Sequence, residues 1–156
     1  MEWLVEKAVE IGVDRIIPLR CHNSERTVLK TARLRAIMVS AMKQSLKATL
    51  PQLDELTPFD KALATTASAT RYIAYCDPEL PRDRRQLLPQ TLTTANLREE
   101  IAIFIGPEGD FSPEEAQTAM EQGCVPVSLG DSRLRTETAA IVALTMLHAQ
   151  LLTLIS

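Results

Sequence analysis

Apolar residues recur at helical spacing in separate stretches of this chain. Residues 2–11 predict a helix, and Gly12 follows as a helix stop. A longer helix is predicted over 31–48, ended near Pro51, and another over 138–155. The first of these helices is expected to bury the apolar stripe formed by Leu4, Ala8 and Ile11.

Short apolar runs bounded by turn residues lie between these helices. They predict strands at 15–19, 71–76, 101–105 and 125–129. Helices and strands therefore alternate along the chain. This alternation predicts an α/β fold with a mostly parallel sheet covered by helices.

The predicted last helix is apolar on nearly every side. One stripe at helical spacing is formed by Ile141, Leu144, Leu147, Leu151 and Leu154, and further apolar surface by Val142, Met146 and Ile155. A helix of this kind must be buried nearly all round, and the sheet of a small domain seldom covers that much surface. We therefore expect a homodimer with two-fold symmetry.

Length and composition are those of one ordinary globular domain over residues 1–156. We see no apolar run near the roughly 20 residues that span a bilayer, so no membrane association is expected. The cysteines Cys21, Cys76 and Cys124 are scattered and form no Cys-x-x-Cys pair. We expect no metal site and no disulfide framework, and a reduced, cytoplasmic setting.

Charge is distributed unevenly, although the net charge is only -3. Between Arg20 and Lys47 the chain has seven basic residues and a single acid, Glu25. A segment with this asymmetry is suited to phosphates. The alternative is a solvated helix face without a partner.

Glycine and acidic residues follow the predicted strand 101–105 in the sequence "IGPEGDFSPEE". Ser112, Pro113 and Glu115 predict an N-cap, a first-turn proline and a capping box for a following helix. In parallel sheets, ligands bind beyond the carboxyl ends of strands. The loops expected at that edge are 76–78, 106–109 and the stretch from Gly130 onward. The alternative for 106–109 is a plain turn between strand and helix.

Two arginines, two threonines and a glutamate are concentrated in 133–138. Helix capping explains Thr136, Glu137 and Thr138, because an acid suits the positive end of the helix dipole. It does not explain Arg135, a cation at that same end. Arg135 is therefore a candidate for pairing with an anion or a polar base edge.

The motifs "IGPEGDFS" and "LGDSRLRTETA" together resemble the RsmE family of bacterial 16S ribosomal RNA methyltransferases, which methylate N3 of a uridine. "EKAVEIGVDRIIPL", "SERT" and "MKQSLKATLP" match further family signatures in the same order. The resemblance implies the SPOUT class, in which the C-terminal segment forms a trefoil knot. It also implies an N-terminal β-barrel RNA-binding domain and a first strand that this chain lacks, so we expect a catalytic domain truncated at its N-terminus.

The resemblance implies S-adenosylmethionine (SAM) as cofactor and 16S rRNA of the small ribosomal subunit as partner. It places the cofactor against three strand-end loops, formed by Cys76, Asp77, Ile105, Gly106, Pro107, Glu108, Gly109, Leu129, Gly130, Leu134, Arg135 and Thr136. Arg135 is expected to stabilise negative charge on the uracil ring, and Glu108 to position the base or accept its proton. The alternative for Glu108 is a hydrogen bond to the following helix start. The residues matched for RNA binding, or for the active site of a dimer partner, are Arg26, Lys43, Gln44 and Lys47.

This sequence departs from the family pattern at two places. Asp110 stands where a further glycine is usual, and the order Ser132-Arg133-Leu134-Arg135 moves the first arginine by one position. Two other functions stay open. One is a SPOUT methyltransferase acting on a tRNA or on a ribose hydroxyl, and the other is a non-enzymatic module that binds RNA or a nucleotide.

Overall fold

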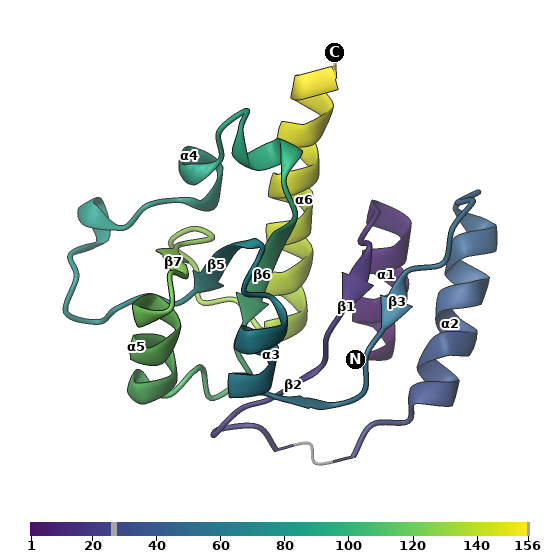
Figure 1. Cartoon of the computed structure of the whole chain (residues 1–156), viewed down its shortest axis with the longest axis horizontal. Helices are drawn as coiled ribbons and strands as arrows, with labels where there is room; N and C mark the ends of the chain where they lie inside the picture. The colour runs from purple at the N-terminus through teal and green to yellow at the C-terminus, as the bar shows by residue number, and fades with distance from the viewer. Residues whose placement is uncertain (26–27, 156) are drawn as a thin grey trace.

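The computed structural model describes residues 1–25 and 28–155. Helices flank the strands throughout the molecule (Figure 1). The α-helices are α1 (Glu2–Ile11), α2 (Thr31–Gln44), α3 (Phe59–Thr65), α4 (Leu88–Thr91), α5 (Pro113–Glu121) and α6 (Thr136–Ile155). Short 3-10 helices lie at Arg82–Arg84 and Asn96–Arg98.

Every strand pair in the described part of the chain is parallel. β5 (Thr70–Ala74) lies between β6 (Ile101–Ile105) and β7 (Val125–Val127). Two smaller pairs are formed by β1 (Arg15–Ile16) with β3 (Gln52–Leu53) and by β2 (Leu19–Arg20) with β4 (Thr57–Pro58). The predicted α/β fold is confirmed, and the trefoil knot and the domain limits stay predictions.

Proline and backbone conformation shift several predicted boundaries. The strand expected at 15–19 is divided into β1 and β2 around Pro18, which lacks the N–H that a ladder needs. The helix expected to reach residue 48 ends at Gln44, and Leu46 then adopts a left-handed conformation with φ 58°. The sequence pattern did not indicate β3, β4 or α3, because these elements are too short for a periodic signal.

The core is divided into separate clusters. Phe59, Phe104 and Phe111 pack together in one of them, with ring centroids 5.8 Å apart for Phe59 and Phe104. Another cluster joins α1 to α2 through Val5, Val9 and Met38. The expected stripe on α1 was therefore only partly right, because the fully covered residues are Val5, Ala8 and Val9.

α6 crosses the molecule beside β6 and packs against α1 and α4 (Figure 1). Contrary to the expectation from the sequence, Thr136–Leu154 is long and apolar enough to cross a membrane by length and composition. Core helices of soluble proteins pass the same test. Ala143 is the one residue of α6 recorded as buried among those whose side chains are described, so most of the helix is only partly covered.

Candidate functional site

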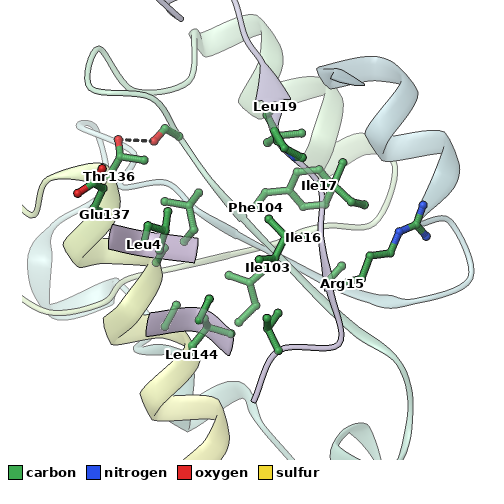
Figure 2. A pocket seen from close by; sticks show the side chains of 18 of the residues that line it. Leu4, Arg15, Ile16, Ile17, Leu19, Ile103, Phe104, Thr136, Glu137 and Leu144 are labelled. Atoms are coloured by element: carbon green, nitrogen blue, oxygen red, sulfur yellow. Dashed lines mark hydrogen bonds between the residues drawn. The ribbon is translucent and has the colours of Figure 1, made fainter. Parts of the chain in front are cut away.

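The loops after β5, β6 and β7 leave the same edge of the sheet, because the strands are parallel. We name residues 106–110 the glycine loop and residues 128–135 the arginine loop. Thr136 joins these two loops, since its Oγ1 donates a hydrogen bond of 2.8 Å to the carbonyl oxygen of Gly106 (Figure 2). The expected meeting of the two motifs in space is therefore present.

A tight turn shapes the glycine loop. The Asp110 N–H donates to the Pro107 carbonyl at 2.8 Å, and Asp110 has φ 65°, a conformation that few residues other than glycine adopt. Its carboxylate Oδ1 accepts a hydrogen bond of 2.7 Å from the Phe111 N–H. Although residue 110 as a whole is exposed, neighbouring protein atoms partly desolvate its carboxyl, and this raises the pKa of Asp110 above its ordinary value against smaller opposing effects of the Phe111 N–H and the charge of Arg133.

The capping box at the start of α5 is confirmed. The Glu115 N–H donates to Ser112 Oγ at 3.1 Å, and the Ser112 N–H donates to Glu115 Oε1 at 2.9 Å. The residue that bonds to the helix start is therefore Glu115, and not Glu108. The side chain of Glu108 is exposed and takes no part in the helix start, which leaves it available to a ligand.

The glycines of the two loops are required for different reasons. A Cβ added to Gly106 would lie 3.0 Å from Asp110 Oδ1, and one added to Gly109 would lie 3.0 Å from Asn23 Cβ. These two glycines therefore make room for protein atoms. A Cβ on Gly130 would meet no atom within 4 Å, although its φ of 134° disfavours other residues. Of the three, Gly130 alone faces open space.

The arginine loop is anchored only at its ends. Ser128 continues the sheet through a parallel bridge to Leu87, and its Oγ exchanges hydrogen bonds of 3.1 and 3.2 Å with Gly130. At the other end the Arg135 carbonyl accepts a hydrogen bond of 2.8 Å from the Ala139 N–H. Within the described part of the chain, the backbone groups of Leu129 and Leu134 make no hydrogen bond.

Arg135 and Glu108 are both exposed at this edge of the sheet. In the part of the chain that the structure describes, neither forms an ion pair. A charge that no internal partner neutralises remains free for a substrate. The neighbouring Glu137 is different, because its carboxylate pairs with the amino terminus of Met1.

Cys76 and Asp77 lie in the loop after β5 and are exposed. This loop is folded on itself: Asp77 Oδ1 accepts a hydrogen bond of 2.9 Å from the Glu79 N–H, and the Asp77 carbonyl accepts one of 3.2 Å from Arg85. The residues are therefore at the expected edge of the sheet. Among the described residues, no hydrogen bond or ion pair joins them to the glycine loop or the arginine loop.

A large open cavity of about 960 Å³ borders one side of the site. β6, the segment of β1 and β2, and the helices α1 and α6 line it. Ile103 and Phe104 face Ile16 and Ile17 in Figure 2, and Leu4 and Leu144 lie on the helix side. Of the expected cofactor residues it touches Ile105, Gly106, Pro107, Glu108, Gly109, Arg135 and Thr136. It does not reach Cys76, Asp77, Leu129, Gly130 or Leu134, so the expected residues are divided between this cavity and the edge of the arginine loop.

The residues expected to bind RNA are not gathered at this site. Lys43, Gln44 and Lys47 lie at the C-terminal end of α2, where Lys47 approaches Gly12 and His148. His148 is about 18 Å along α6 from Thr136, at 1.5 Å per residue. Arg26 lies outside the described residues. Within one chain, the three described residues are thus remote from the glycine loop.

The sequence reasoning missed the loop after β2. Asn23 Nδ2 donates hydrogen bonds of 3.1 Å to the carbonyls of both Gly109 and Asp110. The His22 N–H donates to Glu115 Oε2 at 3.0 Å. Burial, then the charge of Glu115, raises the pKa of the nearby Cys21 thiol to about 12, so this thiol stays neutral. The signal in the sequence was the position of this loop after a predicted parallel strand.

Comparison with known proteins agrees with this geometry. The model of a family described as the RNA methyltransferase domain matches residues 1–148. The chain belongs to this family. Its glycine and arginine loops both lie within the matched residues.

Members of the family with curated names and solved structures are longer than this chain. It is 30% identical over 155 residues to ribosomal RNA small subunit methyltransferase E of Synechocystis, covering 96% of this chain and 49% of that protein. A probable rRNA-methyltransferase of Porphyromonas gingivalis superposes with a TM-score of 0.88 at 44% identity, covering 98% of this chain and 63% of that one. Ribosomal RNA small subunit methyltransferase E of Neisseria gonorrhoeae, solved with bound SAM, superposes with a TM-score of 0.76 at 28% identity, covering 96% and 60%.

Proposed function

We propose that this chain is the catalytic part of a SAM-dependent methyltransferase that modifies N3 of a uridine in 16S rRNA of the small ribosomal subunit. The observation that carries the proposal is the link from Thr136 to Gly106, which joins both motifs of the family at one sheet edge. The family match over residues 1–148 supports it. The relatives' names supply the rRNA substrate, and a cytoplasmic location follows from that substrate.

The residues present fit an adenosyl cofactor. Leu129 and Leu134 have backbone donors and acceptors that bond to no other described residue and can pair with the edges of an adenine. Open space beside Gly130 lets a ligand approach the backbone closely. Residues 105–109, 129–130 and 134–136 would hold the cofactor, with Cys76 and Asp77 at its rim. When bound, SAM supplies a methyl group already activated by the sulfonium.

The protein then has to position the uracil and manage its proton. Arg135, exposed and outside any recorded ion pair, stabilises negative charge as it develops on the ring. Glu108 has no structural partner at the α5 start and accepts the N3 proton or orients the base. Both side chains belong to loops that the Thr136 hydrogen bond joins.

We also propose a homodimer. The apolar stripe of α6 is only half-buried at Leu144, Leu147 and Leu151, which line the open cavity together with Trp3 of α1, itself 51% exposed. A second copy would cover this surface. It would also bring a different part of the molecule, such as the remote Lys43 and Lys47, toward each site. Light scattering should give twice the 17.3 kDa chain mass, and Trp3→Glu should lower it. A monomer with intact SAM binding contradicts the dimer.

Mass spectrometry of rRNA from cells that lack the gene tests the function. We expect loss of one uridine N3 methyl group from 16S rRNA and its return when the full-length gene is restored. A missing methyl group on a tRNA or a ribose hydroxyl would instead favour another methyltransferase of this class. Unchanged RNA would favour a binding module without activity.

A further inference from the structure

The side chain of Asn23 bridges two segments that are far apart in the sequence. Its amide nitrogen donates to the carbonyl oxygens of Gly109 and Asp110, both at 3.1 Å. Both partners are acceptors, so only the NH2 group of the amide satisfies them. An aspartate at this position has the same shape but no proton to donate at neutral pH.

The loop that carries Asn23 is itself well anchored. The Cys21 N–H donates to Ser24 Oγ at 2.9 Å, and the Ser24 N–H donates to the Cys21 carbonyl at 3.1 Å. Cys21 is buried in the aromatic core cluster, and the His22 N–H is held by Glu115 at 3.0 Å. Asn23 therefore extends from a fixed turn and can hold a less stable partner.

The glycine loop is the partner that needs such support. Gly109 and Asp110 are exposed, and Asp110 has a positive φ although it is not glycine. A strained conformation of this kind persists only when neighbouring groups fix it. The hydrogen bonds from Asn23 fix the carbonyls of both residues, and they do so from outside the loop.

The close approach of Asn23 also explains Gly109. A Cβ on Gly109 would lie 3.0 Å from Asn23 Cβ and 3.5 Å from Asn23 Cγ. The second glycine of the Gly-Pro-Glu-Gly stretch is therefore required by Asn23. A side chain at residue 109 would move the amide away from both carbonyls.

We propose that Asn23 is a positioning residue for the cofactor: by holding the Gly109 and Asp110 carbonyls, it keeps the glycine loop in the conformation that binds the adenosyl group. Asn23 acts through the loop and does not itself take part in the reaction. The inference rests on the proposed function for its ligand, whereas the contact between Asn23 and Gly109 can be tested without a ligand.

Calorimetry with S-adenosylhomocysteine tests the positioning role. Asn23→Ala should weaken binding about fivefold, which corresponds to the net worth of roughly one hydrogen bond. Asn23→Asp should weaken it further, because a carboxylate would face two carbonyl oxygens. His22→Ala is the matched control and should leave affinity unchanged, since residue 22 contacts Glu115 through its backbone N–H. Wild-type affinity in both Asn23 variants would overturn the proposal.

A double-mutant cycle separates this proposal from the proposed function. Gly109→Ala and Asn23→Gly should each lower the urea midpoint of unfolding, and the double variant should be no less stable than the worse single variant. This coupling is expected whether or not the chain binds a nucleoside. Additive losses would show that Asn23 does not hold residue 109. If the wild-type chain fails to bind S-adenosylhomocysteine while the coupling is present, the proposed cofactor is wrong, and Asn23 holds the loop for another ligand.

Discussion

The glycine loop and the arginine loop leave the same edge of the sheet and differ in how they are held. Asn23, Thr136 and its own turn through Pro107 fix the glycine loop by hydrogen bonds of 2.8 to 3.1 Å. The arginine loop has contacts at Ser128 and Arg135, and residues 131–133 between them are exposed. The first loop therefore has a backbone held at several points, whereas the middle of the second is exposed to solvent.

The position of each loop in the fold accounts for this difference. The glycine loop contacts the loop after β2 through Asn23 and the start of α6 through Thr136, so protein atoms flank it on two sides although residues 108–110 are exposed. Both loops follow edge strands of the sheet, β6 and β7, but residues 131–133 of the arginine loop extend into solvent. The glycines show the same contrast, because Gly106 and Gly109 face protein atoms and Gly130 faces open space.

The largest effect is expected from Arg135→Ala. If the arginine loop supplies chemistry, this change should lower methylation of 16S rRNA about a hundredfold, as for loss of one group that stabilises charge. The free energy of unfolding should hardly change, because Arg135 forms no ion pair with any other described residue. Mass spectrometry of rRNA from cells with only the variant gene measures the methylation. Arg133→Ala is the control, and equal methylation in all strains would remove Arg135 from the reaction.

Gly106→Val should have the next largest effect, this time on stability. Its side chain would meet Asp110 Oδ1 at 3.0 Å and the Phe111 backbone nitrogen at 3.2 Å. Overpacking of this kind costs about 1–3 kcal/mol in the free energy of unfolding, and S-adenosylhomocysteine binding should be lost. Gly130→Ala meets no atom and therefore tests backbone strain alone. Urea unfolding gives the free energy of unfolding of both variants. An equal or greater loss of stability in Gly130→Ala would contradict the closer packing of Gly106.

Thr136→Val should separate the two loops at a smaller cost. It removes the 2.8 Å hydrogen bond to the Gly106 carbonyl, and we expect a loss of about 0.5–1.5 kcal/mol in the free energy of unfolding. Thr145→Val is the matched control, because its hydroxyl bonds only within α6, to the Ile141 carbonyl at 2.7 Å, and is exposed. Unchanged stability and unchanged S-adenosylhomocysteine affinity in Thr136→Val would show that the loops are independent.

The smallest effect concerns pH and Asp110. Because burial raises the pKa of this carboxyl, the folded state favours its protonated form. Its contribution to stability is therefore present at low pH and is lost as the pH rises from the ordinary value of 3.8 through the raised one. Wild type should lose stability relative to Asp110→Asn over that rise, measured by urea unfolding at each pH. If the difference in free energy of unfolding between the two proteins stayed constant with pH, a raised pKa of Asp110 would be contradicted.

Local signals were sufficient for much of the fold. β6 and α1 have the predicted bounds, because a bounded apolar run and an amphipathic stretch before Gly12 depend on nearby residues. The capping box of Ser112 and Glu115 was also predictable, since both partners lie within one helical turn. The candidate loops were found by the same reasoning, because carboxyl ends of parallel strands share one edge.

The sequence by itself determined the alternation of strands and helices, the loops that carry the site, and the family. Tertiary structure alone decided which partners those loops have. Asn23 reaches Gly109 across 86 residues, and Thr136 reaches Gly106 across 30. No periodicity or turn rule predicts contacts at such separations, because these contacts depend on which strands lie side by side. The position of Lys43 shows the same limit: the motif predicts contact with RNA or with the partner's active site, and only the fold shows that it lies at the C-terminal end of α2, away from the glycine loop of its own chain.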